Sequence, residues 1–180
     1  MNLVMTQEQV LRWLTEFRQM VKDNEAYLGD LDSAIGDGDH GINMCRGTEA
    51  MMTSLESQQV QSVSEIFKLS GMALLSKVGG ASGPLYGSAF IAMSKKANEE
   101  GTNIIDWLEA GLDAIKLRGK SDVEEKTMID VWQPSIEALK SGTLTVNKID
   151  EFVDHTKELK ALKGRASYLG DRSIGHIDPG

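Results

Sequence analysis

Residues 30–43 read Asp-Leu-Asp-Ser-Ala-Ile-Gly-Asp-Gly-Asp-His-Gly-Ile-Asn, with four carboxylates and three glycines in fourteen positions. No Lys or Arg lies between Lys22 and Arg46. Carboxylates this close together repel one another unless a cation lies between them. The stretch therefore predicts a site for a hard metal ion with oxygen ligands, and the rest of the chain should fold so as to support it.

The composition excludes several classes of protein. The 180 residues contain no Pro/Gly/Ser-rich linker and fit one domain, residues 1–180, which buries about 70 % of the surface of its unfolded chain. A net charge of -8 argues against a nucleic-acid partner. The single cysteine, Cys45, excludes an intramolecular disulfide, and no leader peptide or run of 18 apolar residues is present. We expect a cytoplasmic protein without a membrane segment.

Apolar residues recur at three- and four-residue spacing along most of the chain, which predicts seven amphipathic helices. Capping boxes or single caps mark several starts, and glycines mark two ends. Six of the predicted helices cover residues 6–24, 41–55, 62–78, 103–118, 127–139 and 145–164. The fourth has Pro84 in its first turn and continues through Leu85, Phe90, Ile91 and Met93. No segment alternates apolar and polar residues convincingly over five positions, so we expect an all-α protein without a sheet.

Two helix starts are ambiguous. The third helix can begin at Ser62 or Ser64. For the sixth, Ser121 with Glu124 and Thr127 with Asp130 both match a capping box, and Thr127 is the preferred start.

Short loops between helices favour an up-and-down antiparallel array. In such an array the odd-to-even connections, residues 25–40, 79–83 and 119–126, fall at the same end. The segment after the seventh helix, residues 165–180, returns to that end. The topology thus gathers an acidic loop, a glycine loop and two segments with basic residues around one site.

The acidic loop has the spacing D-x4-D-x-D, formed by Asp32, Asp37 and Asp39, and its glycines allow tight folding. Calcium in an EF-hand is the competing interpretation, but neither Asp32 nor Asp37 starts the required register of ligands. Magnesium is usually held by a few carboxylates together with substrate phosphates. We therefore expect magnesium here.

The glycine run 79–83 precedes a helix, where backbone N–H groups and the helix N-terminus favour an anion. It lacks the Lys-Ser/Thr of a P-loop, and by itself such a glycine run is more often a helix–helix turn. Divalent ions between this loop and the aspartates would relieve the repulsion between the carboxylates and a nucleotide diphosphate. Lys120, Lys126 and Arg165 are candidates for further positive charge.

The sequence does not decide between alternative roles for its histidines. His40 either donates to a phosphate or caps a helix, His176 contacts a ligand or braces a loop, and His155 lies within the last helix. No Ser/His/Asp or Cys/His arrangement is present in the sequence, so we expect no catalytic nucleophile in this chain.

Four motifs, at residues 31–41, 79–87, 125–128 and 164–170, resemble the nucleotide-binding L subunit (DhaL) of dihydroxyacetone kinase of the phosphotransferase-system-dependent type. The resemblance implies a barrel of eight antiparallel helices that binds ADP or ATP and two Mg²⁺. The metal ligands that it implies are Asp32, Asp37 and Asp39. The nucleotide-binding residues that it implies are His40, Gly41, Ile42, Asn43, Ala81, Ser82, Gly119, Met128, Arg165 and Asp178.

The resemblance also implies a transferase of glycerol metabolism. ADP stays bound as a coenzyme, a phosphohistidine M subunit phosphorylates it, and the phosphoryl group passes to dihydroxyacetone on a K subunit. Two alternatives remain: an ATP-exchanging or fatty-acid-type kinase component, or a module that signals nucleotide state to a regulator. The chain departs from the family pattern at Glu124, where relatives commonly have Gly, and at Gly180, where the family usually continues into a last helix.

Overall fold

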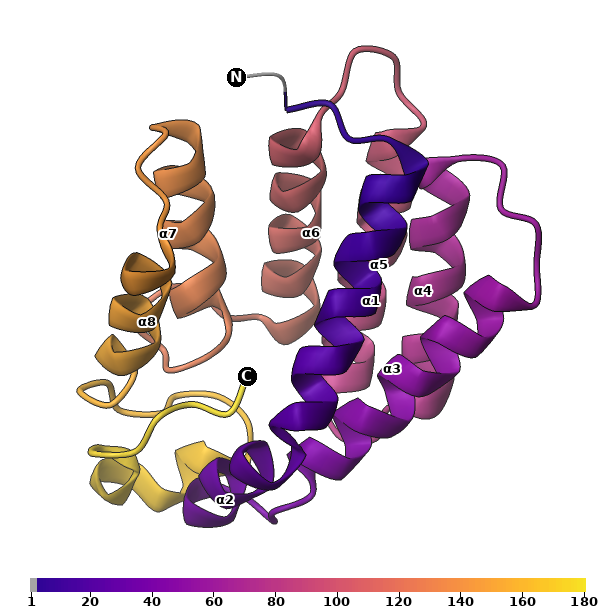
Figure 1. The fold of residues 1–180 in the computed structure, drawn as a ribbon. Coiled ribbons are helices and arrows are strands. Elements are labelled where there is room, and N and C mark those ends of the chain that lie inside the picture. The colour runs from indigo at the N-terminus through magenta and orange to yellow at the C-terminus, as the bar shows by residue number, and fades with distance from the viewer. Residues whose placement is uncertain (1–2) are drawn as a thin grey trace.

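The computed structural model describes residues 3–180, which form helices and no strand, as the sequence predicts. Eight α-helices and one 3-10 helix follow one another in this part of the chain (Figure 1). Their bounds are α1 Gln7–Asp23, α2 Glu25–Ile35, α3 His40–Glu56, α4 Val63–Lys77, α5 Ser82–Ala97, α6 Ile104–Gly119, α7 Ile129–Lys140, α8 Val146–His155 and η1 Arg165–Ser173.

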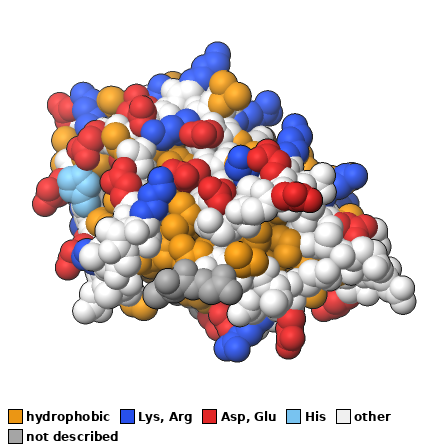
Figure 2. All heavy atoms as spheres, turned by 90° about the horizontal axis from the view of Figure 1, so that it is seen from above, with side chains coloured by type: hydrophobic (Ala, Val, Ile, Leu, Met, Phe, Trp, Pro, Cys, Tyr) orange, Lys and Arg blue, Asp and Glu red, His pale blue; other side chains and the backbone are white. Residues whose placement is uncertain are grey.

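The longer helices form an up-and-down array. Helices α3, α4, α5 and α6 pack in sequence against one another, and α1 packs against α3 and α4. Figure 1 shows α7 beside α6 and α8 beside α7, with α2 and η1 together at the lower end. Seen from the upper end, hydrophobic side chains gather near the centre of the face and charged ones surround them (Figure 2). No helix within residues 3–180 is long and apolar enough to span a bilayer.

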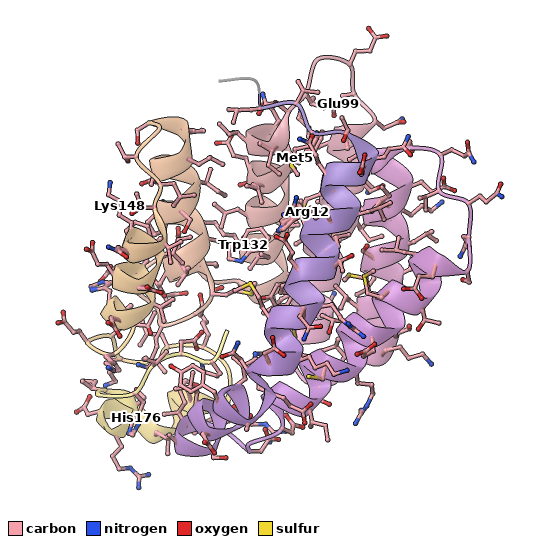
Figure 3. All side chains as sticks on the ribbon, in the orientation of Figure 1. Met5, Arg12, Glu99, Trp132, Lys148 and His176 are labelled. Atoms are coloured by element: carbon pink, nitrogen blue, oxygen red, sulfur yellow. The ribbon has the colours of Figure 1, made fainter. Side chains whose placement is uncertain are left out.

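The main core lies between α1, α3, α4, α5 and α6, and its centre is the fully buried Phe67. The ring of Phe67 lies 5.7 to 6.1 Å from the rings of Trp13, Phe90 and Trp107. A smaller cluster joins α5, α6 and α7, where Trp132 of α7 packs between α7 and α6 (Figure 3). The apolar periodicity therefore placed the core of α1, α3, α4, α5 and α6 well, whereas Val146 and Leu162 of the predicted last helix are exposed.

The structure confirms capping residues that the sequence predicts at several helix starts. Thr6 and Gln9 form the predicted capping box of α1, and Ser62 is the cap of α4. Thr145 caps α8 through the N–H of Lys148. α7 begins at Ile129, close to the preferred start, and the hydroxyl of Thr127 accepts from the N–H of Ile129.

The prediction that residues 25–40 form a loop is wrong, because residues 25–35 are helix α2. The signal for this helix was present in Leu28, Leu31 and Ile35, which have helical spacing and are partly or fully buried. The neighbouring glycine and aspartates, which have low helix propensity, obscured it. The non-helical acidic loop is therefore only the short turn after Ile35.

The predicted end of the last helix is also wrong. α8 ends at His155 and not near Gly164, and none of its own residues is buried. Beyond it, the buried Leu159 and Ala161 fix the chain in a non-helical course, and the N–H of Leu162 donates to the carbonyl of Glu125. Gly164 has a left-handed φ of 62°, but it precedes η1 instead of ending α8.

Candidate functional site

Four separated segments line one pocket of about 470 Å³. They are the acidic turn after α2, the glycine loop before α5, the connection from α6 to α7, and the residues around Gly164 and Asp178. These are the segments that the up-and-down topology gathers at one end. The site therefore unites parts of the chain that lie up to about 145 residues apart.

The acidic turn brings three carboxylates together. One oxygen from each of Asp32, Asp37 and Asp39 lies within 4.8 Å of the others. Asp32 is in the last turn of α2, and a Cβ on Gly36 would lie 2.2 Å from its Oδ1, so only glycine leaves room for this carboxylate. Gly38 has a φ of +79°, which favours glycine as well. Three hard oxygen donors on one short turn suit Mg²⁺.

Two positive groups already face these carboxylates. Arg165, at the start of η1, donates from Nη1 to Oδ2 of Asp37. The backbone N–H of His40, at the start of α3, donates to Oδ2 of Asp32 at 3.2 Å. The helix dipole of α3 therefore also opposes the negative charge. Arg165 therefore lies at this site, and its contribution of positive charge toward a phosphate stays a prediction.

The glycine loop lies against the acidic turn. Ser82 begins α5, and its Oγ lies 3.1 Å from Nδ1 of His40. A Cβ on Gly83 would lie 2.3 Å from the carbonyl oxygen of Val78, so the loop turns more tightly than an alanine would permit. Gly80 has a left-handed φ of +65°. The N-terminus of α5 is thus held close to the carboxylates, where its electropositive end favours an anion.

Burial controls the ionisation of the polar groups around the pocket. Burial lowers the pKa of His40, although Asp32 and Asp39 act in the opposite direction, so the imidazole is neutral near pH 7. Burial raises the pKa of Tyr86 to about 12. It also raises the pKa of Asp178 to about 7, against the effect of Lys126. Burial is therefore strong on the side of Tyr86 and Asp178, whereas Asp37 and Asp39 on the acidic turn are exposed to solvent.

Most predicted site residues line this pocket. The predicted lining residues are Asp32, Asp37, Asp39, His40, Asn43, Ala81, Ser82, Gly119, Met128, Arg165 and Asp178. Gly41 and Ile42 lie outside the lining. A Cβ on Gly41 would lie 2.0 Å from the carbonyl oxygen of Glu25, so this glycine allows α3 to approach α2. The side chain of Ile42 is exposed. Their contacts with phosphate remain predictions.

Sequence reasoning missed the apolar wall of the pocket, formed by Ile35, Pro84, Leu85, Tyr86 and Ile115. Their spacing marked them as helix or core residues, and nothing in a helical pattern distinguishes a residue that faces a pocket from one that faces the core. An apolar wall beside a few polar groups is typical of small-molecule sites. Of the three basic residues considered, Lys120 is outside the lining, and Lys126 directs its ammonium group to backbone carbonyls.

Glu124 adopts the backbone conformation that a glycine would favour, with a φ of +65°. Its N–H donates to Oδ1 of Asp130 at 2.5 Å, and Oδ2 of Asp130 accepts from the N–H of Thr127 at 2.8 Å. The Glu124 carboxylate lies 3.1 Å from Nε2 of His155. The departure from glycine therefore leaves the turn itself intact.

Comparison with known proteins points to one family. Residues 34–180 match the model of the DAK2 domain. The chain is 51 % identical to the ADP-binding subunit DhaL of PEP-dependent dihydroxyacetone kinase 1 of Listeria innocua, over 94 % of this chain and 87 % of that protein. It is 50 % identical to the ADP-binding subunit DhaL of the PTS-dependent dihydroxyacetone kinase of Lactococcus lactis, over 98 % of this chain and 92 % of that protein.

A solved structure extends the comparison to the fold. The dihydroxyacetone kinase of Citrobacter freundii, determined in complex with AMP-PNP and Mg²⁺, superposes with a TM-score of 0.77 and 26 % identity. The match covers 98 % of this chain but only 32 % of that chain, so this chain spans about a third of the Citrobacter enzyme.

Proposed function

This chain belongs to the DAK2 domain family, and we propose that it is the ADP-binding subunit of a PEP-dependent dihydroxyacetone kinase. Half of its residues are identical to those of two such subunits over nearly the whole length of each chain. The observation that carries the proposal is structural: three carboxylates meet the electropositive start of α5 in one pocket. This arrangement fits a metal–nucleotide complex better than either component alone.

The charges favour two magnesium ions. Three carboxylates face about three negative charges of a bound diphosphate, and Mg²⁺ bound between them would neutralise the charge that develops during phosphoryl transfer. Asp32, Asp37 and Asp39 are the proposed ligands. His40, Ser82 and the amides at the start of α5 are the proposed contacts of the phosphates.

The chain supplies position and charge, not a nucleophile. Phosphoryl transfer requires mainly alignment of donor and acceptor and neutralisation of charge. We propose that a phosphohistidine M subunit phosphorylates the bound ADP and that a K subunit presents dihydroxyacetone. ADP then acts as a coenzyme that remains on this chain between turnovers.

Calorimetry of ADP with and without Mg²⁺ tests the site. We expect binding only with Mg²⁺, and roughly 100-fold weaker binding in Asp37→Ala, because this variant lacks one of the three proposed metal ligands, and changes even to residues that support a metal ligand typically cost about 10- to 100-fold in affinity. Asp30→Asn is the matched control, because Asp30 is an exposed carboxylate of the same segment outside the pocket. Equal affinity in parent and Asp37→Ala would refute the proposed metal site.

A second candidate, an ATP-exchanging kinase component, is favoured by 33 % identity to the dihydroxyacetone kinase of Citrobacter freundii, although this chain covers only 30 % of that protein. The two candidates differ in how long the nucleotide stays bound. Retention of labelled ADP during incubation with excess ATP supports the coenzyme role. Rapid replacement of the label supports the exchanging kinase.

A further inference from the structure

Lys126 is almost completely buried, with 2 % of its surface exposed. It lies in the connection between α6 and α7, three residues before the start of α7. None of the ion pairs found within residues 3–180 involves its ammonium group. Burial lowers the pKa of its ammonium group, and the carboxylates of Asp178 and Asp130 oppose this shift without forming an ion pair with it. A buried ammonium of this kind is costly unless its hydrogen bonds are satisfied.

The backbone of this connection directs the side chain inward. Lys126 has a left-handed φ of +59°, as Glu124 does two residues earlier. The carboxylate of the buried Asp130 holds this turn through the N–H groups of Glu124 and Thr127, on both sides of Lys126. Left-handed conformations cost energy for residues other than glycine, so this geometry is imposed by the contacts around it.

The ammonium group joins two further segments. It donates to the carbonyl oxygen of Thr156, just after α8, at 2.5 Å, and to the carbonyl oxygen of His176. Figure 3 shows His176 at the lower end, beside η1. One side chain therefore links the α6–α7 connection, the end of α8 and residues 174–180.

Two more hydrogen bonds fix residues 174–180 at the same place. The N–H of Asp178 donates to Oγ1 of Thr156 at 3.0 Å, and the N–H of Gly175 donates to the carbonyl oxygen of Lys157 at 2.7 Å. Asp178, Pro179 and Gly180 line the nucleotide pocket. The contacts that hold this part of the pocket wall are therefore polar and centre on Lys126 and Thr156.

We propose that Lys126 is a positioning residue, which holds residues 174–178 against the end of α8 and so brings Asp178 to the nucleotide pocket. This inference rests on the proposed function for its effect on ADP binding. Lys126 also lines the pocket, but two of its three N–H donors are directed to carbonyl oxygens outside the phosphate region, so we assign it a role different from neutralising phosphate charge.

Hydrogen exchange of the full chain tests, without any nucleotide, whether Lys126 holds residues 174–178 in place. In Lys126→Met, the amides of Gly175 and Asp178 should exchange at least about 10-fold faster, because the segment loses the buried hydrogen bonds that close it. Lys157→Met is the matched control: this exposed lysine adjoins Thr156, and within residues 3–180 the only ion pair of its side chain is with Asp154. Unchanged exchange in a folded Lys126→Met would overturn the proposal.

Mg-ADP affinity then separates positioning from direct contact. We expect Lys126→Met and Asp178→Ala each to weaken Mg-ADP binding about 10-fold. The double variant should bind as well as the single variant of lower affinity, because both substitutions act through the same segment and their losses do not add. Additive losses would show that Lys126 acts independently of Asp178 and would contradict the proposal. Thr156→Val, which removes the hydroxyl that accepts from Asp178, replaces Lys126→Met if that variant does not fold. If the parent does not bind Mg-ADP, the proposed function fails. The hydrogen-exchange experiment still tests whether Lys126 holds residues 174–178 in place.

Discussion

The two parts of this molecule, helices α1–α6 and residues 120–180, are stabilised by different interactions. The first part encloses a core of apolar side chains around Phe67. The second attaches to α5 and α6 through the smaller apolar cluster of α7, but its α8 buries none of its own residues. The connections around α8 depend on Lys126, Asp130 and the buried Ser173. Because the pocket lies between the two parts, its metal-binding side rests on apolar packing and its opposite side on specific hydrogen bonds.

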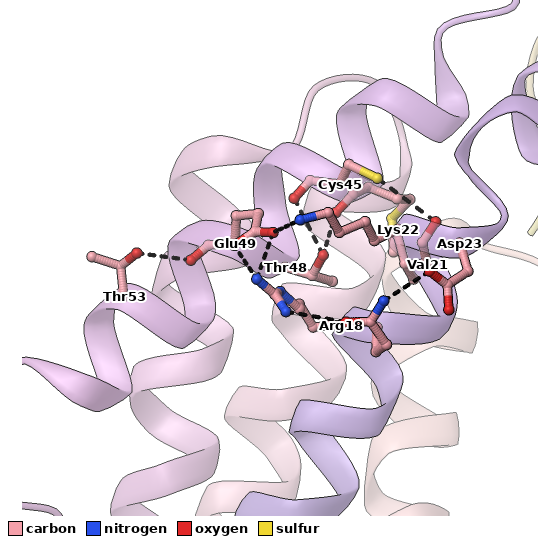
Figure 4. A network of polar contacts seen from close by, with 10 residues as sticks. Arg18, Val21, Lys22, Asp23, Cys45, Thr48, Glu49 and Thr53 are labelled. Carbon is pink, nitrogen blue, oxygen red and sulfur yellow. Dashed lines mark hydrogen bonds and ion pairs between the residues drawn. The ribbon is translucent and has the colours of Figure 1, made fainter.

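Polar networks occur in both parts but differ in burial. Arg18 of α1 donates to Glu49 of α3 at 3.0 Å, and Lys22 lies 3.6 Å from the same carboxylate (Figure 4). These groups are partly exposed, so water and salt screen them and their contribution to stability is small. Lys126 is shielded from water, so its contacts determine the local structure.

The largest expected effect is in the apolar part. Phe67→Ala removes a fully buried ring that contacts three other aromatic rings. We expect a loss of about 3–5 kcal/mol in the free energy of unfolding, measured with urea. Leu117→Ala is the control, because Leu117 is 82 % exposed, and it should change stability by less than about 0.5 kcal/mol. Similar losses in both would contradict the apolar core as the source of stability.

A second substitution tests how the acidic turn attaches to the apolar part. Gly41→Ala places a Cβ 2.0 Å from the carbonyl oxygen of Glu25, so α2 and α3 must separate, at a cost of about 1–3 kcal/mol. In Gly29→Ala, on α2, the new Cβ would meet its nearest neighbour at an ordinary 3.5 Å. We expect the control to be at least as stable as the parent, since alanine favours helix. Equal thermal midpoints for the two variants would exclude close packing as the role of Gly41.

The sequence predicted the first part well for a physical reason. Apolar periodicity and capping residues act over three or four positions, so α1, α4 and α6 were assigned nearly to the residue. The acidic turn was also predictable, because repulsion between neighbouring carboxylates is a local property. The family motifs added the candidate nucleotide contacts that now lie around the pocket.

The second part was less predictable because its structure depends on distant partners. Lys126 is a charged residue in a loop, which normally indicates exposure, and its burial follows from carbonyls 30 and 50 positions away. The end of α8 depends on the burial of Leu159 and Ala161, which continue an apolar pattern without continuing the helix. Helix α2 was missed for a local reason, the low helix propensity of its glycine and aspartates.

Cys45 provides a chemical measure of how tightly α1 and α3 pack. Burial, followed by the nearby carboxylates of Glu25 and Glu49, raises the pKa of its thiol to about 11. The protonated form is favoured below that value, so the thiolate fraction at pH 8 is about 100-fold smaller than in the unfolded chain. Because a thiolate of higher pKa is more nucleophilic, Cys45 should react with a disulfide reagent about 10-fold more slowly than in the unfolded chain. The rate should rise up to about pH 11 in the folded protein. Equal rates in native and denaturing buffer would show that α1 separates readily from α3.

The smallest expected effect concerns the backbone of the second part. Glu124 has a φ of +65°, a conformation that costs a residue with a Cβ about 1 kcal/mol and costs glycine little. Glu124→Ala removes the carboxylate that faces His155 but keeps the Cβ, whereas Glu124→Gly removes both. We expect Glu124→Gly to be more stable than Glu124→Ala by about 1 kcal/mol in urea unfolding. If glycine gives no advantage over alanine, Asp130 and Thr127 do not hold this turn in its left-handed form, and the polar part of the molecule is more adaptable than its hydrogen bonds indicate.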